Sequence, residues 1–361
     1  MIVFVTPAAD RWGIDEYLQQ HGGSLAERMV ILTYEEIVAR RELPLGTYVF
    51  AGIDQLTPTE TEIAAQCWKA LSSASPEIRL INHPARALRR YQLLRACFER
   101  QRNAFRVRRA TEWHRRQRFP VFVRAEGEHT GSLSPVLHNH RELVQALATS
   151  LVQGYRLRDL LIVEYCHTAD DDGIFRLYSA AIVGETIVPK ALVHNRNWIT
   201  KWEGRLLDAR LAGEQLAYLE NHPHEHWLRE TFALARIGYG LINYGVRDGV
   251  PQVWEINTNP TLVRRTGAPS VMAADQWALV APAQARFIHQ FQCALEQLDS
   301  AVDPDRRVRI AVSPSELRRL GREKRLRRRL RARRTTIAQL AAAPLWLARR
   351  LRRRPRPRPL A

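Results

Sequence analysis

The sequence predicts a mixed α/β protein with a small parallel α/β domain at its N-terminus, a larger α+β region and a basic C-terminal extension. Short apolar runs alternate with helical patterns over the first eighty residues, which is typical of a parallel sheet. Later apolar runs are joined by short polar turns, which favours antiparallel hairpins. The charge changes abruptly near residue 300. We therefore expect three units, at residues 1–83, 84–300 and 301–361.

Four apolar runs in the first unit are predicted to be buried strands: Ile2–Thr6, Met29–Thr33, Thr47–Gly52 and Ile78–Asn82. The segments between them are predicted to hold helices. One of these begins after Thr57, which is suited to the N-cap position. Pro58 suits the first helical turn, and Glu60 completes a capping box with Thr57.

The second unit begins with a helix predicted from His83 to about Gln101, where Pro84 suits the helix start and apolar residues keep helical spacing. Further strands are expected at Phe119–Glu126, Leu160–Cys166, Phe175–Val183, Thr186–Val193, Gly240–Val246 and Pro251–Thr258. Further helices are expected at about Asn139–Gly154, His224–Ile237 and Ala273–Ser300. Helices and antiparallel hairpins in this order predict an α+β region.

The segment Val253–Pro260 carries the most informative polar pattern. Alternate side chains of a strand share a face, so Glu255 and Asn257 point one way while Trp254 points into packing. A carboxylate beside an amide oxygen supplies hard ligands for Mg²⁺, which typically keeps waters and phosphates as its other ligands. Pro260 ends the strand.

Glu255, Asn257 and Pro260 match a Glu-x-Asn-x-x-Pro signature, and the chain from roughly His83 to Ser300 resembles the ATP-grasp superfamily. That superfamily includes glutathione synthetases, D-alanine–D-alanine ligases and ribosomal-protein glutamate ligases. The resemblance implies a two-lobed ATP-grasp domain with ATP and Mg²⁺ (or Mn²⁺) as cofactors. It also implies an ATP-dependent ligase that joins a carboxylate to an amine or thiol through an acyl phosphate.

The same resemblance implies roles for individual residues. Phosphate contacts are expected from Arg124 and from Arg89 or Arg90, and from a small loop made of His129, Thr130, Gly131 and Ser132. The adenine hinge is expected at Glu164, Tyr165 and Cys166. Arg176 and Lys190 are expected to act on the transferred phosphate, with Lys201 as a further candidate. Metal ligands are expected at Asn243, Glu255 and Asn257.

Two departures from the superfamily pattern favour a second hypothesis. Arginine stands where lysine is usual at both phosphate-contacting positions, and Asn243 stands where a metal carboxylate is usual. The alternative is therefore a nucleotide-binding or regulatory protein with weakened catalysis. For Asn243 to share a face with Glu255, we expect a three-residue hairpin loop, Arg247–Gly249, because an odd loop gives the required register.

Other polar clusters favour simpler interpretations. Three histidines at His222, His224 and His226 suggest zinc, but Pro223 and a helix start favour a polar helix N-terminus. The acidic run Asp170–Asp172 is predicted to be a turn after the hinge, with a ribose contact as its functional alternative. Exposed arginines on strands and helices are often only solvated, which is the alternative for Arg89, Arg124 and Arg176.

Almost all of the net charge of +18 lies in the tail. Residues 301–361 hold 21 basic and 4 acidic residues, which leaves 34 basic and 33 acidic residues in the body. The tail is predicted to hold a basic helix over Ser313–Arg334, then an apolar segment over Ile337–Leu351. We expect it to bind an anionic membrane surface, or alternatively nucleic acid. A scaffold that acts through this tail is a third hypothesis.

The remaining composition points to a cytoplasmic protein that the tail attaches to a membrane surface. The four cysteines are widely separated and form no C-x-x-C pair, which favours buried thiols in a reducing compartment. The first residues lack the basic and apolar segments of a secretory signal. No apolar stretch approaches the ~18 residues of a transmembrane helix.

Overall fold

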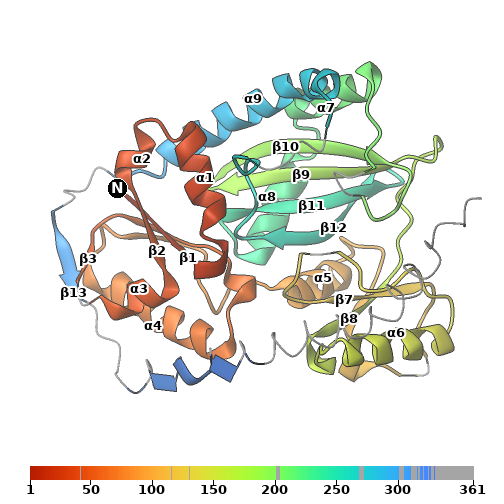
Figure 1. Cartoon of the computed structure of the whole chain (residues 1–361), viewed down its shortest axis with the longest axis horizontal. Helices are drawn as coiled ribbons and strands as arrows, with labels where there is room; N and C mark the ends of the chain where they lie inside the picture. The colour runs from red at the N-terminus through yellow and green to blue at the C-terminus, as the bar shows by residue number, and fades with distance from the viewer. Residues whose placement is uncertain are drawn as a thin grey trace, which may run out of the picture.

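The computed structural model describes residues 1–40, 42–114, 116–129, 131–200, 204–267, 272–300 and 305–309, and within the tail residues 315, 318–319, 321–323, 325–326 and 329. The predicted α/β class is confirmed, because parallel and antiparallel sheets are packed with helices (Figure 1). Short 3-10 helices also occur among the described residues, namely η1 (Ala8–Asp10), η2 (Ile53–Gln55), η3 (Ala110–Glu112) and η4 (Leu157–Asp159).

The N-terminal region contains the predicted parallel sheet, in the strand order β2-β1-β4-β5. Its strands are β1 (Ile2–Thr6), β2 (Met29–Thr33), β4 (Thr47–Phe50) and β5 (Arg79–Ile81). Its helices are α1 (Trp12–His21), α2 (Leu25–Arg28), α3 (Tyr34–Ala39) and α4 (Pro58–Ala74). The predicted capping box of α4 is present, with Thr57 and Glu60 bonded to each other's backbone N–H groups.

The helix predicted from His83 to about Gln101 is shorter than expected. The observed helix, α5, spans Arg90–Glu99. The N–H of Leu88 donates to the carbonyl of Ala235, outside this helix, at 2.8 Å. Arg89 is extended at the N-cap position, so the helix begins one residue later. Local spacing predicted the helix but not its first residue.

The central region forms a small lobe with its own core. Its antiparallel sheet has the order β6-β8-β7, made of β6 (Val107–Arg109), β8 (Leu160–Glu164) and β7 (Val121–Ala125). Helix α6 (His140–Val152) begins at the N-cap Asn139 and packs on β7. The core of this lobe is separate from the main core and consists of Ala110, Val121, Val123, Leu137, Leu143, Leu147, Leu160 and Ile162.

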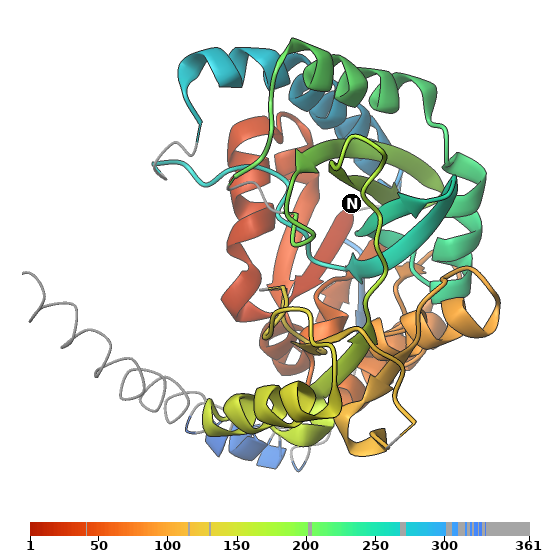
Figure 2. The same cartoon turned by 90° about the vertical axis from the view of Figure 1, so that its right-hand side faces the viewer.

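A four-stranded antiparallel sheet forms the larger lobe, in the order β10-β9-β11-β12. Its strands are β9 (Phe175–Val183), β10 (Thr186–Asn195), β11 (Tyr239–Arg247) and β12 (Val250–Asn257). Helices α7 (Ala209–Asn221) and α9 (Ala274–Glu296) pack on its β9–β10 side, and α8 (Glu225–Ala235) leads into β11. Figure 2 shows this sheet above the smaller lobe, so the two lobes face each other.

The hairpin between β11 and β12 differs from the prediction. Its loop has two residues, Asp248 and Gly249, both with positive φ, and Arg247 pairs with Val250. The prediction of a three-residue loop, Arg247–Gly249, is therefore wrong. A β-bulge further along, where Asn243 pairs with Glu255 and Tyr244 with Val253, shifts the register by one residue. Asn243 still shares a face with Glu255, as the site prediction required, and it lies directly opposite Glu255.

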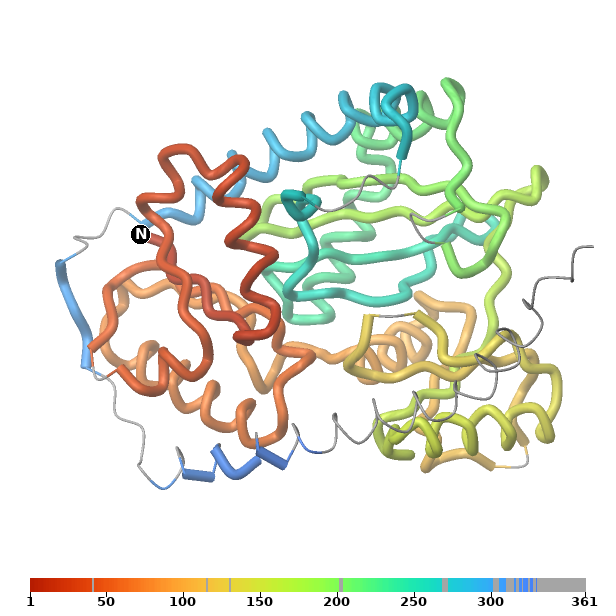
Figure 3. The backbone as a smooth tube through the Cα atoms, viewed as in Figure 1, coloured from red at the N-terminus to blue at the C-terminus, as the bar shows by residue number. Residues whose placement is uncertain are grey.

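The N-terminal region and the larger lobe share one continuous hydrophobic core, so the boundary predicted at residue 83 stays a prediction. Helix α9 runs from the top of the larger lobe to the N-terminal region (Figure 3). Beyond it, β13 (Arg307–Arg309) pairs with β3 (Glu42–Pro44), and Arg319 forms an ion pair with Glu62 of α4 at 2.8 Å.

Most of the two predicted tail segments lies outside the described residues. Of Ser313–Arg334 only isolated residues are described, and of Ile337–Leu351 none is. Within the described part of the chain, no helix is long and apolar enough to cross a membrane.

Candidate nucleotide site

A cavity of about 560 Å³ lies between the two lobes. The strands of the larger lobe and β7 of the smaller lobe supply its walls. Most of the predicted site residues line it, namely Arg124, His129, Gly131, Ser132, Tyr165, Cys166, Arg176, Lys190, Asn243, Glu255 and Asn257. Thr130 and Lys201 lie outside the described residues. The fold therefore brings together segments that are far apart in the sequence.

Glu255 is the centre of the polar network on the cavity wall. Its Oε2 accepts from Arg90 at 2.5 Å and from Arg124 at 2.7 Å, and its Oε1 accepts from the amide of Asn243 at 3.2 Å. Although burial alone would raise the pKa of Glu255, Arg90, Arg124 and His129 hold it well below its usual range. Glu255 is therefore an ion-paired carboxylate at neutral pH.

Of the two adjacent arginines predicted for the phosphate site, Arg90 bonds to Glu255 and Arg89 does not. The guanidinium of Arg89 donates to the carbonyl of Leu56 and to the hydroxyl of Thr61, beside α4 and away from the cavity. The assignment of Arg89 to the phosphate site is therefore corrected. The reason is the late start of α5, which turns Arg90 toward Glu255.

Arg90 also forms hydrogen bonds with the end of β7 and the segment that follows it. Its Nη1 donates to the carbonyls of Ala125 at 2.9 Å, Glu126 at 2.5 Å and Glu128 at 2.8 Å. Only 4% of its side chain is exposed. Arg90 thus connects Glu255 to the segment that leads into the predicted phosphate loop.

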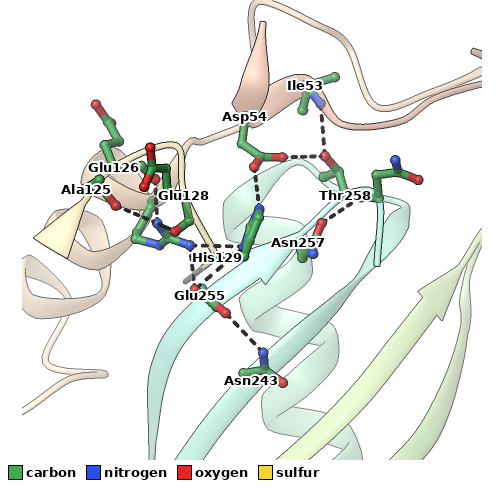
Figure 4. A network of polar contacts seen from close by, with 12 residues as sticks. Ile53, Asp54, Ala125, Glu126, Glu128, His129, Asn243, Glu255, Asn257 and Thr258 are labelled. Carbon is green, nitrogen blue, oxygen red and sulfur yellow. Dashed lines mark hydrogen bonds and ion pairs between the residues drawn. The ribbon is translucent and has the colours of Figure 1, made fainter. Parts of the chain in front are cut away.

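His129 connects this network to the N-terminal region (Figure 4). Its Nε2 lies 2.8 Å from Oδ2 of Asp54, which follows β4, and its Nδ1 lies 3.9 Å from Oε2 of Glu255. Burial alone would lower the pKa of His129, but the two carboxylates raise it to about 9. Asp54 also accepts from the hydroxyl of Thr258, just past β12, at 3.0 Å.

Protonated His129 should make stability depend on pH. Its pKa is about 9 when folded and about 6.5 when unfolded, so the folded state retains the proton more strongly. This stabilisation is fully present below about pH 6.5 and is lost as the pH rises through about 9. We expect the advantage of wild type over His129→Gln to shrink by about 2 kcal/mol across that interval.

The measurement is urea unfolding of both proteins at several pH values. The matched control is His226→Gln, because the His226 side chain is 88% exposed and lies outside the cavity. The same pH dependence in His129→Gln as in wild type would contradict the role of His129.

Asp54 was not predicted as a site residue, although its position in the sequence could have indicated it. Asp54 follows a buried parallel strand, and groups at the carboxyl ends of such strands often contribute to binding sites. Gly52 lets the chain turn there, because its φ is +64 and a Cβ would lie 2.5 Å from Pro7. The strand end and the glycine together mark the turn that places Asp54 beside His129.

Two predicted cationic residues have different surroundings. Arg176 lies on the cavity wall but is bound by three carboxylates, at 2.8 Å from Asp170, 2.8 Å from Asp172 and 3.1 Å from Glu214. Lys190 occupies a bulge of β10 and donates to the carbonyl of Thr261. Burial lowers the pKa of Lys190 to about 8.

Two residues of the predicted adenine hinge form hydrogen bonds within the smaller lobe. Glu164 accepts from the backbone N–H of Arg106 at 3.0 Å, and the N–H of Tyr165 donates to Pro120 at 2.9 Å. Tyr165 and Cys166 line the cavity, whereas Glu164 does not. Trp198, which was not predicted, stacks obliquely on Phe122 with ring centroids 4.9 Å apart. This end of the cavity is aromatic and apolar.

The side-chain oxygens predicted as Mg²⁺ ligands accept hydrogen bonds or form ion pairs with other residues of the protein. Asn243 Oδ1 accepts from Ser179 Oγ at 2.7 Å, Asn257 Oδ1 accepts from the N–H of Asn259 at 2.8 Å, and Glu255 is ion-paired. Among the described residues lining the cavity, Glu255 is the only carboxylate. Mg²⁺ favours charged oxygen ligands, so this arrangement does not fit a resident divalent cation.

Searches with protein-family models and against curated proteins find no match. Several solved structures are similar. D-alanine–D-alanine ligase from Bacillus anthracis, complexed with ATP, is 13% identical, with 82% of this chain and 98% of that chain covered and a TM-score of 0.45. An L-amino acid ligase from Bacillus licheniformis is 10% identical, covering 85% and 78%, with a TM-score of 0.41. A RimK domain ATP-grasp protein from Sphaerobacter thermophilus is 11% identical, covering 80% and 99%, with a TM-score of 0.43.

Proposed function

We propose that this protein binds ATP in the cavity between the two lobes and acts as an ATP-dependent ligase of the ATP-grasp type. The observation that carries the proposal is the polarity of the cavity. Arg124 and Lys190 lie on its walls, while Phe122, Tyr165 and Trp198 give it an aromatic surface. Cationic groups suit a phosphate chain, and an aromatic surface suits a flat base.

The proposed reaction has two steps. An oxygen of the substrate carboxylate attacks the γ-phosphorus of ATP, the bond to the ADP oxygen breaks, and an acyl phosphate forms. An amine or thiol then attacks the acyl carbon and inorganic phosphate leaves. Arg124 and Lys190 would stabilise the charge on the transferred phosphoryl group. Arg176 is not needed for this assignment, because three carboxylates bind its guanidinium.

Replacing Arg124 with alanine should lower the affinity for ATP by about 10- to 100-fold. Hydrogen bonds to charged groups contribute about 1.5–3 kcal/mol, and 1.4 kcal/mol corresponds to a factor of ten. The measurement is calorimetric titration of the full chain with ATP. Arg118→Ala is the matched control, because Arg118 is exposed on the same lobe and outside the cavity. Equal affinities of the two variants would contradict the role of Arg124.

A second candidate is a nucleotide-binding protein that turns over little ATP. Asn243 favours it, because the residue opposite Glu255 is an amide and brings no charge to the site. The two candidates are separated by ADP release from ATP in the presence of pooled carboxylates and amines. ATP binding with ADP release supports the ligase, and ATP binding without it supports the second candidate.

A further inference from the structure

We infer that Glu255 is a counter-ion of Arg90 and Arg124 rather than a metal ligand, and that the cavity binds the phosphates of ATP without a divalent cation. This inference rests on the proposed binding of ATP. It concerns how the phosphate charge is neutralised, which the proposed function leaves open.

Positively charged side chains outnumber negatively charged ones around Glu255. Two guanidinium groups share one carboxylate oxygen, Oε2, at 2.5 Å and 2.7 Å. The side chains of Arg90, Arg124 and Glu255 are only 4%, 10% and 14% exposed. With protonated His129 and Asp54 included, three cations face two anions, which leaves one positive charge that water screens poorly. An incoming anion would offset that charge, whereas a divalent cation would add to it.

Arg124 also has unused hydrogen-bonding capacity beside the cavity. Its bond to Glu255 uses one Nη2 group, while its Nε is buried and, within the described part of the chain, bonds to nothing. A buried donor without an acceptor is costly, and such donors are rare in folded proteins. Arg124 lines the cavity, so we expect a phosphate oxygen there to bond to its guanidinium group.

Arg90 makes the complementary contribution behind the cavity wall. Its Nη1 is occupied by three backbone carbonyls, and its Nη2 bonds to Glu255. Arg90 is not among the residues that line the cavity. It therefore neutralises Glu255 from behind, so that Arg124 can present its charge to a ligand.

The wild-type protein gives the first test. Full-length protein is titrated with ATP in EDTA and again in excess Mg²⁺, with inorganic tripolyphosphate as a competitor in EDTA. We expect the two dissociation constants to agree within about threefold, since the protein's own cations neutralise the phosphates, and tripolyphosphate should displace ATP. Binding that appears only with Mg²⁺ would overturn this inference but leave the proposed function standing. Absence of binding under both conditions would overturn both.

Glu255→Gln gives the second test, because the two roles of Glu255 predict opposite changes. If Glu255 is a counter-ion, glutamine frees the guanidinium groups, and the affinity for ATP in EDTA should stay or rise by up to about tenfold. A metal ligand would instead show a loss of tenfold or more in Mg²⁺, which would overturn the inference. Glu230→Gln is the control, since Glu230 pairs with Arg102 outside the cavity. If Glu255→Gln does not fold, the wild-type comparison still decides.

Discussion

Arg90→Ala should lower the free energy of unfolding by about 3–5 kcal/mol, because it breaks a buried ion pair by removing one partner. The guanidinium of Arg90 donates to the carbonyls of Ala125, Glu126 and Glu128 and to the carboxylate of Glu255. Alanine leaves these acceptors without their donor in a region that water reaches poorly. Equilibrium unfolding in urea measures the loss.

The matched control lies on the same helix. Arg95→Ala removes an arginine whose side chain is 59% exposed and pairs with Glu99 four residues later. Exposed pairs of this kind contribute about 0.3–0.5 kcal/mol, so its midpoint should stay close to that of wild type. A shift in Arg90→Ala no larger than in Arg95→Ala would contradict the structural role of Arg90.

Local patterns were sufficient for elements whose causes are local. The capping box of α4 and the hairpin of β9 and β10 depend on nearby residues, and both appear as predicted. Strand periodicity predicted a shared face for Glu255 and Asn257, and both line the cavity, but Trp254, which was expected to point into packing, lines it as well. These features required no knowledge of distant contacts.

The face of the sheet on which Asn243 lies was predicted correctly from a wrong turn. A three-residue loop alone would place Asn243 opposite Val253, on the same face as Glu255, whereas the two-residue loop with one bulge places it directly opposite Glu255. The pair Asp248-Gly249 favours the two-residue form. What it does not reveal is the bulge, which lies beside Trp254, the ring that stacks on Phe105 from another element.

The central ion-pair network depends on contacts that sequence spacing does not reveal. Arg89 and Arg90 are adjacent, and helical spacing did not show that Arg89 is the N-cap residue and Arg90 the first residue of α5. Asp54 and His129 are 75 positions apart and meet only because the N-terminal region packs against the smaller lobe. The prediction of metal ligands relied on residue types, whereas the structure shows how their oxygens are already bonded.

Asn82→Ala should destabilise the protein by about 3–5 kcal/mol, through lost hydrogen bonds and backbone strain together. The amide of Asn82 donates to the carbonyls of Phe50 and Tyr239, at 3.2 Å and 2.7 Å. Its oxygen accepts from the N–H groups of Gly238 and Tyr239, at 2.9 Å and 3.1 Å. One buried side chain therefore joins the parallel sheet to the first residue of β11.

The backbone of Asn82 adds a second cost, because its φ of 63° lies in the left-handed region that asparagine and glycine tolerate better than alanine. Asn82→Gly loses the same hydrogen bonds without that strain, so it should be about 1 kcal/mol more stable than Asn82→Ala. Asn221→Ala, at the exposed end of α7, should stay within about 0.5 kcal/mol of wild type.

Urea unfolding distinguishes these contributions. Because the two regions that Asn82 joins share one continuous core, the loss should appear as a shift of a single transition. A variant Asn82→Ala with the wild-type midpoint would show that the four hydrogen bonds contribute nothing to holding the regions together. An early, separate transition would show instead that the parallel sheet unfolds independently of the lobe that carries Glu255.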